Sequence, residues 1–174
     1  MRRLTTAAAG SAAFFVVAPG VVAGLVPWLI SDWDVRWPKS AFGIGMVALG
    51  VALLAATVLV LIRNFVRFVV EGRGTPSPTM QTERLVVGGD YRFVRNPMYL
   101  AVIGAILAQA MIFGSLPLLL YALVVWAMMA TFVRWYEEPV LQNLYGDEYE
   151  RYRLGVRAWL PRLHPWEGDL DHAS

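Results

Sequence analysis

The sequence has 174 residues, enough for one domain, and 57% of them are apolar while 16% are charged. A soluble domain carries about 25% charged residues and could not hide this much apolar surface, so the composition excludes an ordinary soluble protein and predicts an integral membrane protein. The net charge is only +2, and the lack of cysteine excludes disulfides and thiolate metal sites.

The first two predicted elements are helices that span a bilayer. Residues 4–31 and 40–62 contain no charged side chain, and each run exceeds the ~20 residues that a spanning helix needs. Arg2 and Arg3 before the first run are also typical of a signal peptide. The run is longer than the apolar part of such a peptide and lacks a clear cleavage site, so we expect it to remain as a span.

The third uncharged run covers residues 96–133, which is too long for a single span. A turn-forming cluster at 113–117, with the sequence Phe-Gly-Ser-Leu-Pro, interrupts it. We therefore predict two helices, 97–113 and 117–136, joined by a tight turn. The prediction is an all-α fold with four transmembrane helices in a single domain, residues 1–174.

The basic residues predict the orientation of these spans. Only Arg36 and Lys39 fall between spans one and two, and the hairpin turn carries no charge. All other basic residues lie on the opposite side, which the positive-inside rule makes cytoplasmic. We expect both termini at the cytoplasmic face of an inner or plasma membrane, together with the Gly- and Pro-rich loop between spans two and three.

The C-terminal segment predicts a further, amphipathic helix from Asp147 to about Arg157. Gly146 interrupts the preceding residues, and Asp147 with Glu150 forms a capping-box pattern. One interpretation is a surface helix whose arginines contact anionic lipid headgroups, and the other is a lid that closes a site. Tyr149 lies on one face with Tyr152, three residues later.

The segment Arg95–Tyr99, at the start of span three, is a candidate binding site. Asn96 suits the N-cap and Pro97 the first helical position, so the free N–H groups of the first turn and Arg95 would attract an anion. Tyr99 presents its ring to a nucleotide base or a cation. The alternative is an ordinary interfacial arginine at a helix start.

Glu137 and Glu138, at the end of span four, are the second candidate. Carboxylates bind ribose hydroxyls, an ammonium or a sulfonium group, although they are also what a solvated helix end would carry. The hairpin of spans three and four places them at the same end as Arg95–Tyr99. A nucleoside with a zwitterionic amino-acid tail would satisfy both candidates.

These motifs resemble a known family. Leu85–Tyr91, Arg95–Leu100, Glu137-Glu138 and the Tyr145-Gly146-x-x-Tyr149-x-x-Tyr152 pattern are similar to the isoprenylcysteine carboxyl methyltransferases. The Asn-Pro-Met-Tyr and Glu-Glu-Pro pieces also resemble phospholipid N-methyltransferases. The resemblance covers about residues 72–163.

The resemblance implies a membrane enzyme that uses S-adenosylmethionine to methylate a lipid or lipid-like acceptor at the cytoplasmic face. It implies a cofactor site within 72–163, formed by Tyr91, Arg95, Asn96, Pro97, Tyr99, Glu137 and Glu138. For the acceptor we predict Tyr149, Tyr152 and Arg157. The predicted catalytic residues are Glu138, as a base for a protonated amine, and Arg157, which would hold an anionic group.

Two departures from the family pattern concern the acceptor and the fit of the ligand. Asn96 stands where the carboxyl methyltransferases commonly have histidine, which favours the phospholipid or the uncharacterised bacterial-type branches, and Ala101 stands where glycine is frequent. The fold is also similar to part of the NADPH-dependent sterol reductases, and a non-enzymatic membrane protein is a further alternative. We expect membrane lipids as partners, no nucleic acid, and no metal, because His164 and His172 both lie near the C-terminus.

Overall fold

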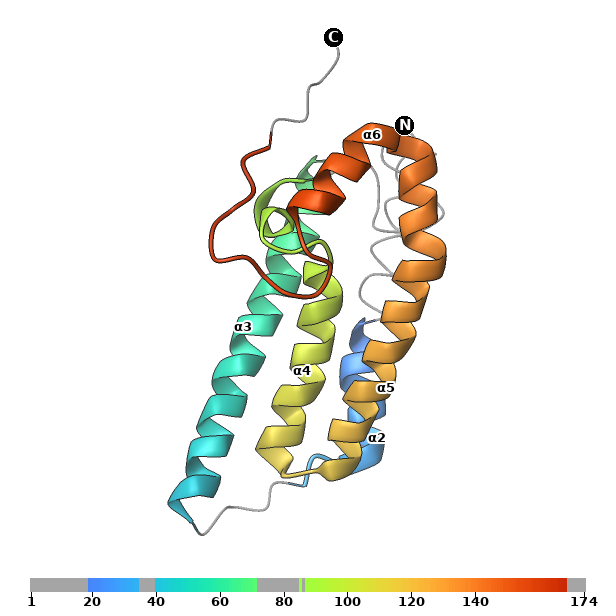
Figure 1. Ribbon diagram of the computed structural model, residues 1–174. Coiled ribbons are helices and arrows are strands. Elements are labelled where there is room, and N and C mark those ends of the chain that lie inside the picture. Colours follow the sequence, from blue (N-terminus) through green and yellow to red (C-terminus); the bar gives the residue numbers. More distant parts are fainter. Residues whose placement is uncertain (1–18, 35–39, 72–84, 86, 169–174) are drawn as a thin grey trace.

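The computed structural model describes residues 19–34, 40–71, 85 and 87–168 (Figure 1). Every regular element in these ranges is a helix, as the predicted all-α class requires. In chain order they are η1 (Val21–Leu25), α2 (Val26–Ser31), α3 (Ala41–Glu71), η2 (Gly89–Arg92), α4 (Pro97–Phe113), α5 (Leu116–Phe132), η3 (Val133–Glu137) and α6 (Glu138–Gly155).

Helices α3, α4 and α5 lie side by side and form a bundle, with α2 beside the lower part of α5 (Figure 1). Two helices are long and apolar enough to cross a membrane, Ala41–Val66 with a mean hydropathy of 2.7 and Leu116–Gly155 with 2.2. The second contains 40 residues and is therefore about 60 Å long, twice the ~30 Å of a bilayer core. About half of this length would suffice to cross such a core, and most of the charged residues fall in the C-terminal half.

The predicted hairpin of 97–113 and 117–136 is present as α4 and α5. Gly114 ends α4 with φ of 58°, a conformation that glycine adopts without strain, and the Ser115 hydroxyl accepts a hydrogen bond from the Leu118 N–H. Along their length the two helices share a buried apolar cluster. Its members are Val102, Ile103, Ile106, Ala122 and Val125.

The helix after α5 is longer than the sequence predicted. Instead of ending at residue 136, the helix passes through the π-turn η3 and continues as α6. A proline inside a helix lacks an N–H and crowds the carbonyl four residues earlier, and the wider π-turn before Pro139 relieves that conflict. The predicted break at Gly146 is present, with φ of 50°.

Three other helix ends differ from expectation. Helix α3 runs to Glu71 instead of residue 62, because arginine is compatible with a helix that leaves the bilayer. Helix α6 stops at Gly155, so Arg157 lies beyond it. The predicted capping box is wrong, since the Glu150 carboxylate accepts two hydrogen bonds from Arg153 instead.

The first predicted span is described only in its second half, as η1 and α2, and residues 1–18 lie outside the described part. Side chains of α4 and α5 hold this half in place. The Gln109 amide donates to the Ala23 carbonyl at 2.7 Å, and the Tyr121 hydroxyl donates to the Val22 carbonyl at 3.0 Å. Both acceptors belong to the π-turn η1, which frees carbonyls from the regular helical pattern.

Candidate functional site

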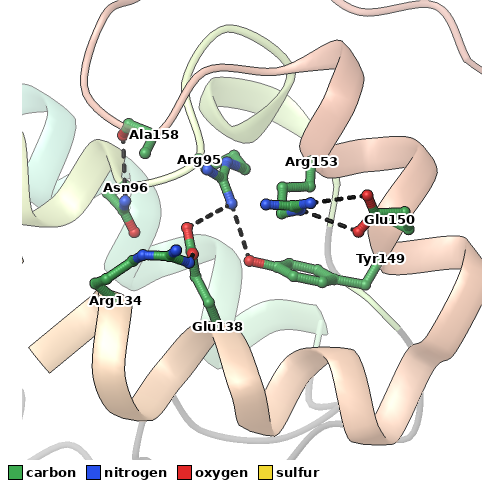
Figure 2. A network of polar contacts seen from close by, with 8 residues as sticks. All are labelled: Arg95, Asn96, Arg134, Glu138, Tyr149, Glu150, Arg153 and Ala158. Carbon is green, nitrogen blue, oxygen red and sulfur yellow. Dashed lines mark hydrogen bonds and ion pairs between the residues drawn. The ribbon is translucent and has the colours of Figure 1, made fainter.

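Three segments meet at the N-terminal end of α4. They are the residues that precede it, the junction of η3 with α6, and the extended residues 156–168, which we call the strap. Pro97 occupies the first position of α4, as predicted, but the side chain of Asn96 does not cap the helix. Its amide instead donates to the Ala158 carbonyl at 3.2 Å and ties the strap to the start of α4 (Figure 2).

Arg95 is the centre of a polar cluster. Its Nη1 lies 2.9 Å from Glu138 Oε1 and donates to the Tyr149 hydroxyl at 2.9 Å. Figure 2 shows the guanidinium between these two side chains. The side chains of Arg95 and Glu138 are each only 12% exposed. This is therefore an ion pair shielded from water, in which each charge depends on the other.

Glu138 has a second cation partner at the edge of the cluster. Arg134 Nη1 lies 3.2 Å from Glu138 Oε2, but its side chain is 72% exposed. The two glutamate oxygens are thus divided between one buried and one exposed guanidinium. One donor within the cluster stays unused, because Arg95 Nε is buried and has no hydrogen-bond partner among the described residues.

Glu137 has a different environment from its neighbour. The Tyr99 hydroxyl donates to its Oε2 at 3.1 Å, and within the described ranges no ion pair joins Glu137 to a cation. Burial raises the pKa of the Glu137 carboxyl, which lies just past the predicted span 117–136. The meeting of Tyr99 with Glu137, and of Arg95 with Glu138, is what the predicted hairpin required.

An aromatic group adjoins Tyr99, the hydrogen-bond partner of Glu137. Trp159, from the strap, lies with its ring 6.4 Å from that of Tyr99 and 6.4 Å from that of Trp126 on α5. It also packs against the apolar cluster shared by α4 and α5. Trp159 therefore joins the strap to the bundle beside Glu137.

Backbone hydrogen bonds fix the strap along residues 92–95. The Arg95 N–H donates to the Arg157 carbonyl at 3.0 Å, and the Arg162 N–H donates to the Phe93 carbonyl at 2.9 Å. Further along, the Trp166 N–H donates to the Arg92 carbonyl at 2.9 Å, and Arg92 Nε returns a bond to the Trp166 carbonyl at 2.6 Å. The strap is thus paired with the backbone segment that carries Arg95.

The residues predicted for the acceptor are not gathered around one opening. Tyr149 and Tyr152 are 2% and 3% exposed, and burial raises the pKa of both hydroxyls. Tyr152 donates to the Tyr91 carbonyl at 2.7 Å, while Tyr149 contacts Arg95. The guanidinium of Arg157 is exposed, and only its backbone carbonyl contacts the cluster.

Arg134 and Trp159 are site neighbours that the sequence did not single out. Arg134 resembled one more basic residue of the cytoplasmic side, and Trp159 lay in a segment with no periodic pattern. The available signal for Arg134 was its spacing of four residues from Glu138, which places both on one helix face. Trp159 offered only its size and apolar surface.

Comparisons with known proteins agree with the motifs. Residues 38–148 match the model of the family described as phospholipid methyltransferase. The chain is 30% identical over 129 residues to a probable protein-S-isoprenylcysteine O-methyltransferase of Oryza sativa subsp. indica, and to the same degree to that of subsp. japonica. Each of these alignments covers 72% of this chain and 62% of the relative. It is 34% identical over 80 residues to the protein-S-isoprenylcysteine O-methyltransferase of Schizosaccharomyces pombe, covering 45% of this chain and 34% of that protein. The chain thus spans less than two thirds of the length of these relatives. No solved structure matches it.

Proposed function

Because this chain belongs to the phospholipid methyltransferase family, we propose that it transfers a methyl group from S-adenosylmethionine to a lipid acceptor at the cytoplasmic membrane face. The observation that carries the proposal is the convergence of Arg95, Glu137 and Glu138 at the N-terminus of α4. An isoprenylated cysteine carboxylate, the acceptor in the names of the rice and yeast relatives, and a phospholipid headgroup are the two acceptor classes of the proposal.

The proposed topology has four spans with the site at the cytoplasmic end of α4. The two long apolar helices and the shorter apolar helices Val21–Ser31 and Pro97–Phe113 support it. The arginines at this end of the bundle support the orientation through the positive-inside rule. Arg134, Arg95 and Arg157 all belong to that end.

The hydrogen-bonding groups at the start of α4 and on Glu137 fit the polar parts of S-adenosylmethionine. Arg95 Nε is a buried donor without a partner, and the first turn of α4 offers backbone N–H groups, so a carboxylate fits beside them. Among the described residues Glu137 forms no ion pair, and such a carboxylate suits an ammonium or the hydroxyls of a ribose. When bound, S-adenosylmethionine would supply an electrophilic methyl group on its sulfonium.

The chain's own residues would act by holding the reactants aligned and dry. The strap and Trp159 exclude water from the side of η2, and the ion pair with Glu138 fixes the guanidinium of Arg95. Both oxygens of Glu138 are occupied by arginines, which argues against its predicted role as a base. Glu137, whose pKa is raised, is the better candidate to accept a proton from an amine acceptor.

The remaining predicted residues receive modified roles in the proposal. Tyr149 and Tyr152 position Arg95 and the segment at Tyr91, because their hydroxyls are already engaged. Arg157, exposed at the start of the strap, would receive the anionic part of the acceptor.

Calorimetric titration of the detergent-purified protein with S-adenosylhomocysteine tests the cofactor proposal. We expect saturable binding that is lost in the Glu137→Ala, Glu138→Ala double variant. Asp147→Asn is the matched control, since it removes an exposed carboxylate from the same helix and should leave binding unchanged. Circular dichroism verifies that both variants stay helical.

A parallel titration with NADPH addresses the alternative enzyme class. Binding of NADPH alone would move the protein to the reductases, and binding of neither ligand would favour a non-enzymatic protein. Either result overturns the proposal.

A further inference from the structure

A second site lies on the other side of α4. A cavity of about 270 Å³ opens between α3 and α4, on the face of α4 formed by Leu100 and Ala101. The α3 side of its wall includes Ala56 and Val60, and the strap contributes Pro161. Tyr99, by contrast, reaches toward Glu137 on the α5 side. The cavity is therefore separate from the polar cluster around Arg95.

Helices α3 and α4 pack closely at two glycines, Gly50 and Gly104, next to the cavity. A Cβ at Gly104 would lie 2.6 Å from Thr57 Cγ2, and a Cβ at Gly50 would lie 2.9 Å from the Ala108 carbonyl oxygen. The two helices are thus in backbone contact toward the C-terminal end of α4. Nearer the N-terminus of α4, the cavity lies between Ala56 and Val60 on α3 and Leu100 and Ala101 on α4.

The wall is apolar except at one end. The Thr57 hydroxyl is satisfied by the Leu54 carbonyl at 2.9 Å, so it offers little to a water molecule. At the cytoplasmic end, the Asp90 carboxylate accepts from the buried Asn64 amide at 2.9 Å and lies 3.5 Å from Arg63. Arg63 is 60% exposed, so most of its guanidinium remains available.

We propose that this cavity holds one hydrocarbon chain of a resident bilayer phospholipid, with its phosphate at Arg63. Ala56, Thr57 and Val60 belong to the apolar helix Ala41–Val66, which places the cavity among lipid tails. The hollow is partly open to its surroundings and its exposed lining is almost wholly apolar, so a hydrocarbon chain suits it better than water, which needs two to four polar partners. An unfilled void would forfeit dispersion contacts that an adjoining lipid chain supplies.

The exposed guanidinium completes the match with a phospholipid. Arginine is the preferred partner of phosphate, and Arg63 stands one turn beyond Val60, at the level where α3 leaves its apolar stretch. A chain in this cavity would contact Pro97 and Pro161. Pro97 follows Asn96 and Pro161 belongs to the strap, so the resident lipid would stabilise the strap against α4 without being the methylated molecule.

A pair of adjacent alanines on α3 allows a matched test. Ala56 lines the cavity and Ala55 does not, while both are exposed. The protein is delipidated in mild detergent, given dioleoylphosphatidylglycerol, and its bound lipid is counted by native mass spectrometry. We expect one retained lipid in the wild type and in Ala55→Leu, and about tenfold weaker retention in Ala56→Leu, the effect of excluding about two methylene groups.

Two further variants test the role of the phosphate and the position of the hydrocarbon chain. Arg63→Gln should remove the preference for dioleoylphosphatidylglycerol over dioleoylglycerol, which lacks the phosphate. Val60→Phe, one turn from Ala56, should weaken retention as Ala56→Leu does and guards against a folding defect in one variant.

Three results would overturn the proposal. Equal retention by Ala55→Leu and Ala56→Leu would show that the lipid lies elsewhere, and no retention by the wild type would show that the cavity is filled by the chain itself. If dioleoylphosphatidylethanolamine, given in place of the phosphatidylglycerol, were retained and gained a methyl group on its amine after addition of S-adenosylmethionine, the bound lipid would be the acceptor and not a resident molecule. The first two readouts measure lipid retention alone and do not require the proposed activity.

Discussion

The bundle and the cap above it are held together by different forces. In the bundle, α4 and α5 share an apolar cluster, and α3 approaches α4 through glycines. In the cap, formed by residues 87–96 and 138–168, directional bonds dominate, from the Arg95–Glu138 pair to the backbone pairing of the strap. Lipid tails are as apolar as leucine, so the bundle depends on shape, whereas the cap depends on satisfying buried polar groups.

This difference predicts where single substitutions have the largest effect. A bundle residue is sensitive if a neighbour cannot move, and a cap residue is sensitive if its partner would be left buried and unpaired. Four experiments, most of them with a paired control variant, follow in order of expected effect.

Arg95→Ala should have the largest effect. It leaves Glu138 without its buried partner, and breaking such a pair costs about 3–5 kcal/mol. Arg134→Ala removes the exposed partner of the same carboxylate, so we expect a cost below about 1 kcal/mol. Equilibrium unfolding in mixed micelles, followed by tryptophan fluorescence, measures both. Equal costs for the two arginines would refute the distinction between the buried and the exposed pair.

Gly104→Ala should cost about 1–3 kcal/mol, the usual range for overpacking. The new methyl would meet Thr57 Cγ2 at 2.6 Å. Thr57→Ser removes that methyl and keeps the hydroxyl, so the double variant should recover most of the loss. Gly45→Ala, where a Cβ meets nothing within 4 Å, is the control and should not destabilise. Failure of Thr57→Ser to rescue Gly104→Ala would show that another contact sets the helix spacing.

Tyr152→Phe should cost about 1–3 kcal/mol, because it leaves the Tyr91 carbonyl in the cap without its hydroxyl partner. Tyr121→Phe removes an equivalent bond to the Val22 carbonyl within the bundle. Tyr121 is less buried than Tyr152, so we expect a smaller effect from it. Thermal unfolding of the two variants decides whether the cap is the more sensitive region, and the reverse order would contradict it.

The smallest effect concerns pH at the surface of the cap. Hydrogen bonds from Arg153 hold the pKa of Glu150 below its ordinary value. The pair therefore stabilises the folded state above the ordinary glutamate pKa, and this contribution is lost as the pH falls through the lowered one. Glu150→Gln should flatten the acid limb of a stability-against-pH curve slightly. An unchanged acid limb would mean that the exposed pair contributes nothing measurable.

Much of the bundle could be predicted from the sequence. The bounds of α4 and the turn at Gly114 follow from Asn-Pro at one end and Gly-Ser-Leu-Pro at the other, which are local signals. The same reasoning placed Tyr99 near Glu137, since a tight hairpin brings the outer ends of its helices together. The break at Gly146 was equally local.

Besides the helix ends, several predictions that failed concerned polar side chains with two possible partners. Asn96 stands at the predicted N-cap position, but its side-chain amide bonds to the strap, more than sixty residues away, instead of capping the helix. Glu150 bonds to Arg153 instead of forming a capping box. Arg157 lies beyond the helix that was expected to carry it. Each choice depends on which distant segment arrives nearby, and local spacing carries no information about that.

The sequence by itself determined the class of the protein, its apolar helices and the pair of motifs that mark its family. Uncharged runs need a bilayer, and proline and glycine set helix ends through their own backbone geometry. The tertiary structure decided the rest: that Glu138 pairs with two arginines while Glu137 pairs with none among the described residues, that the strap bonds to the backbone of Arg95, and that a cavity remains between α3 and α4. Burial and pairing are properties of segments brought together from far apart in the chain, and only the folded arrangement specifies them.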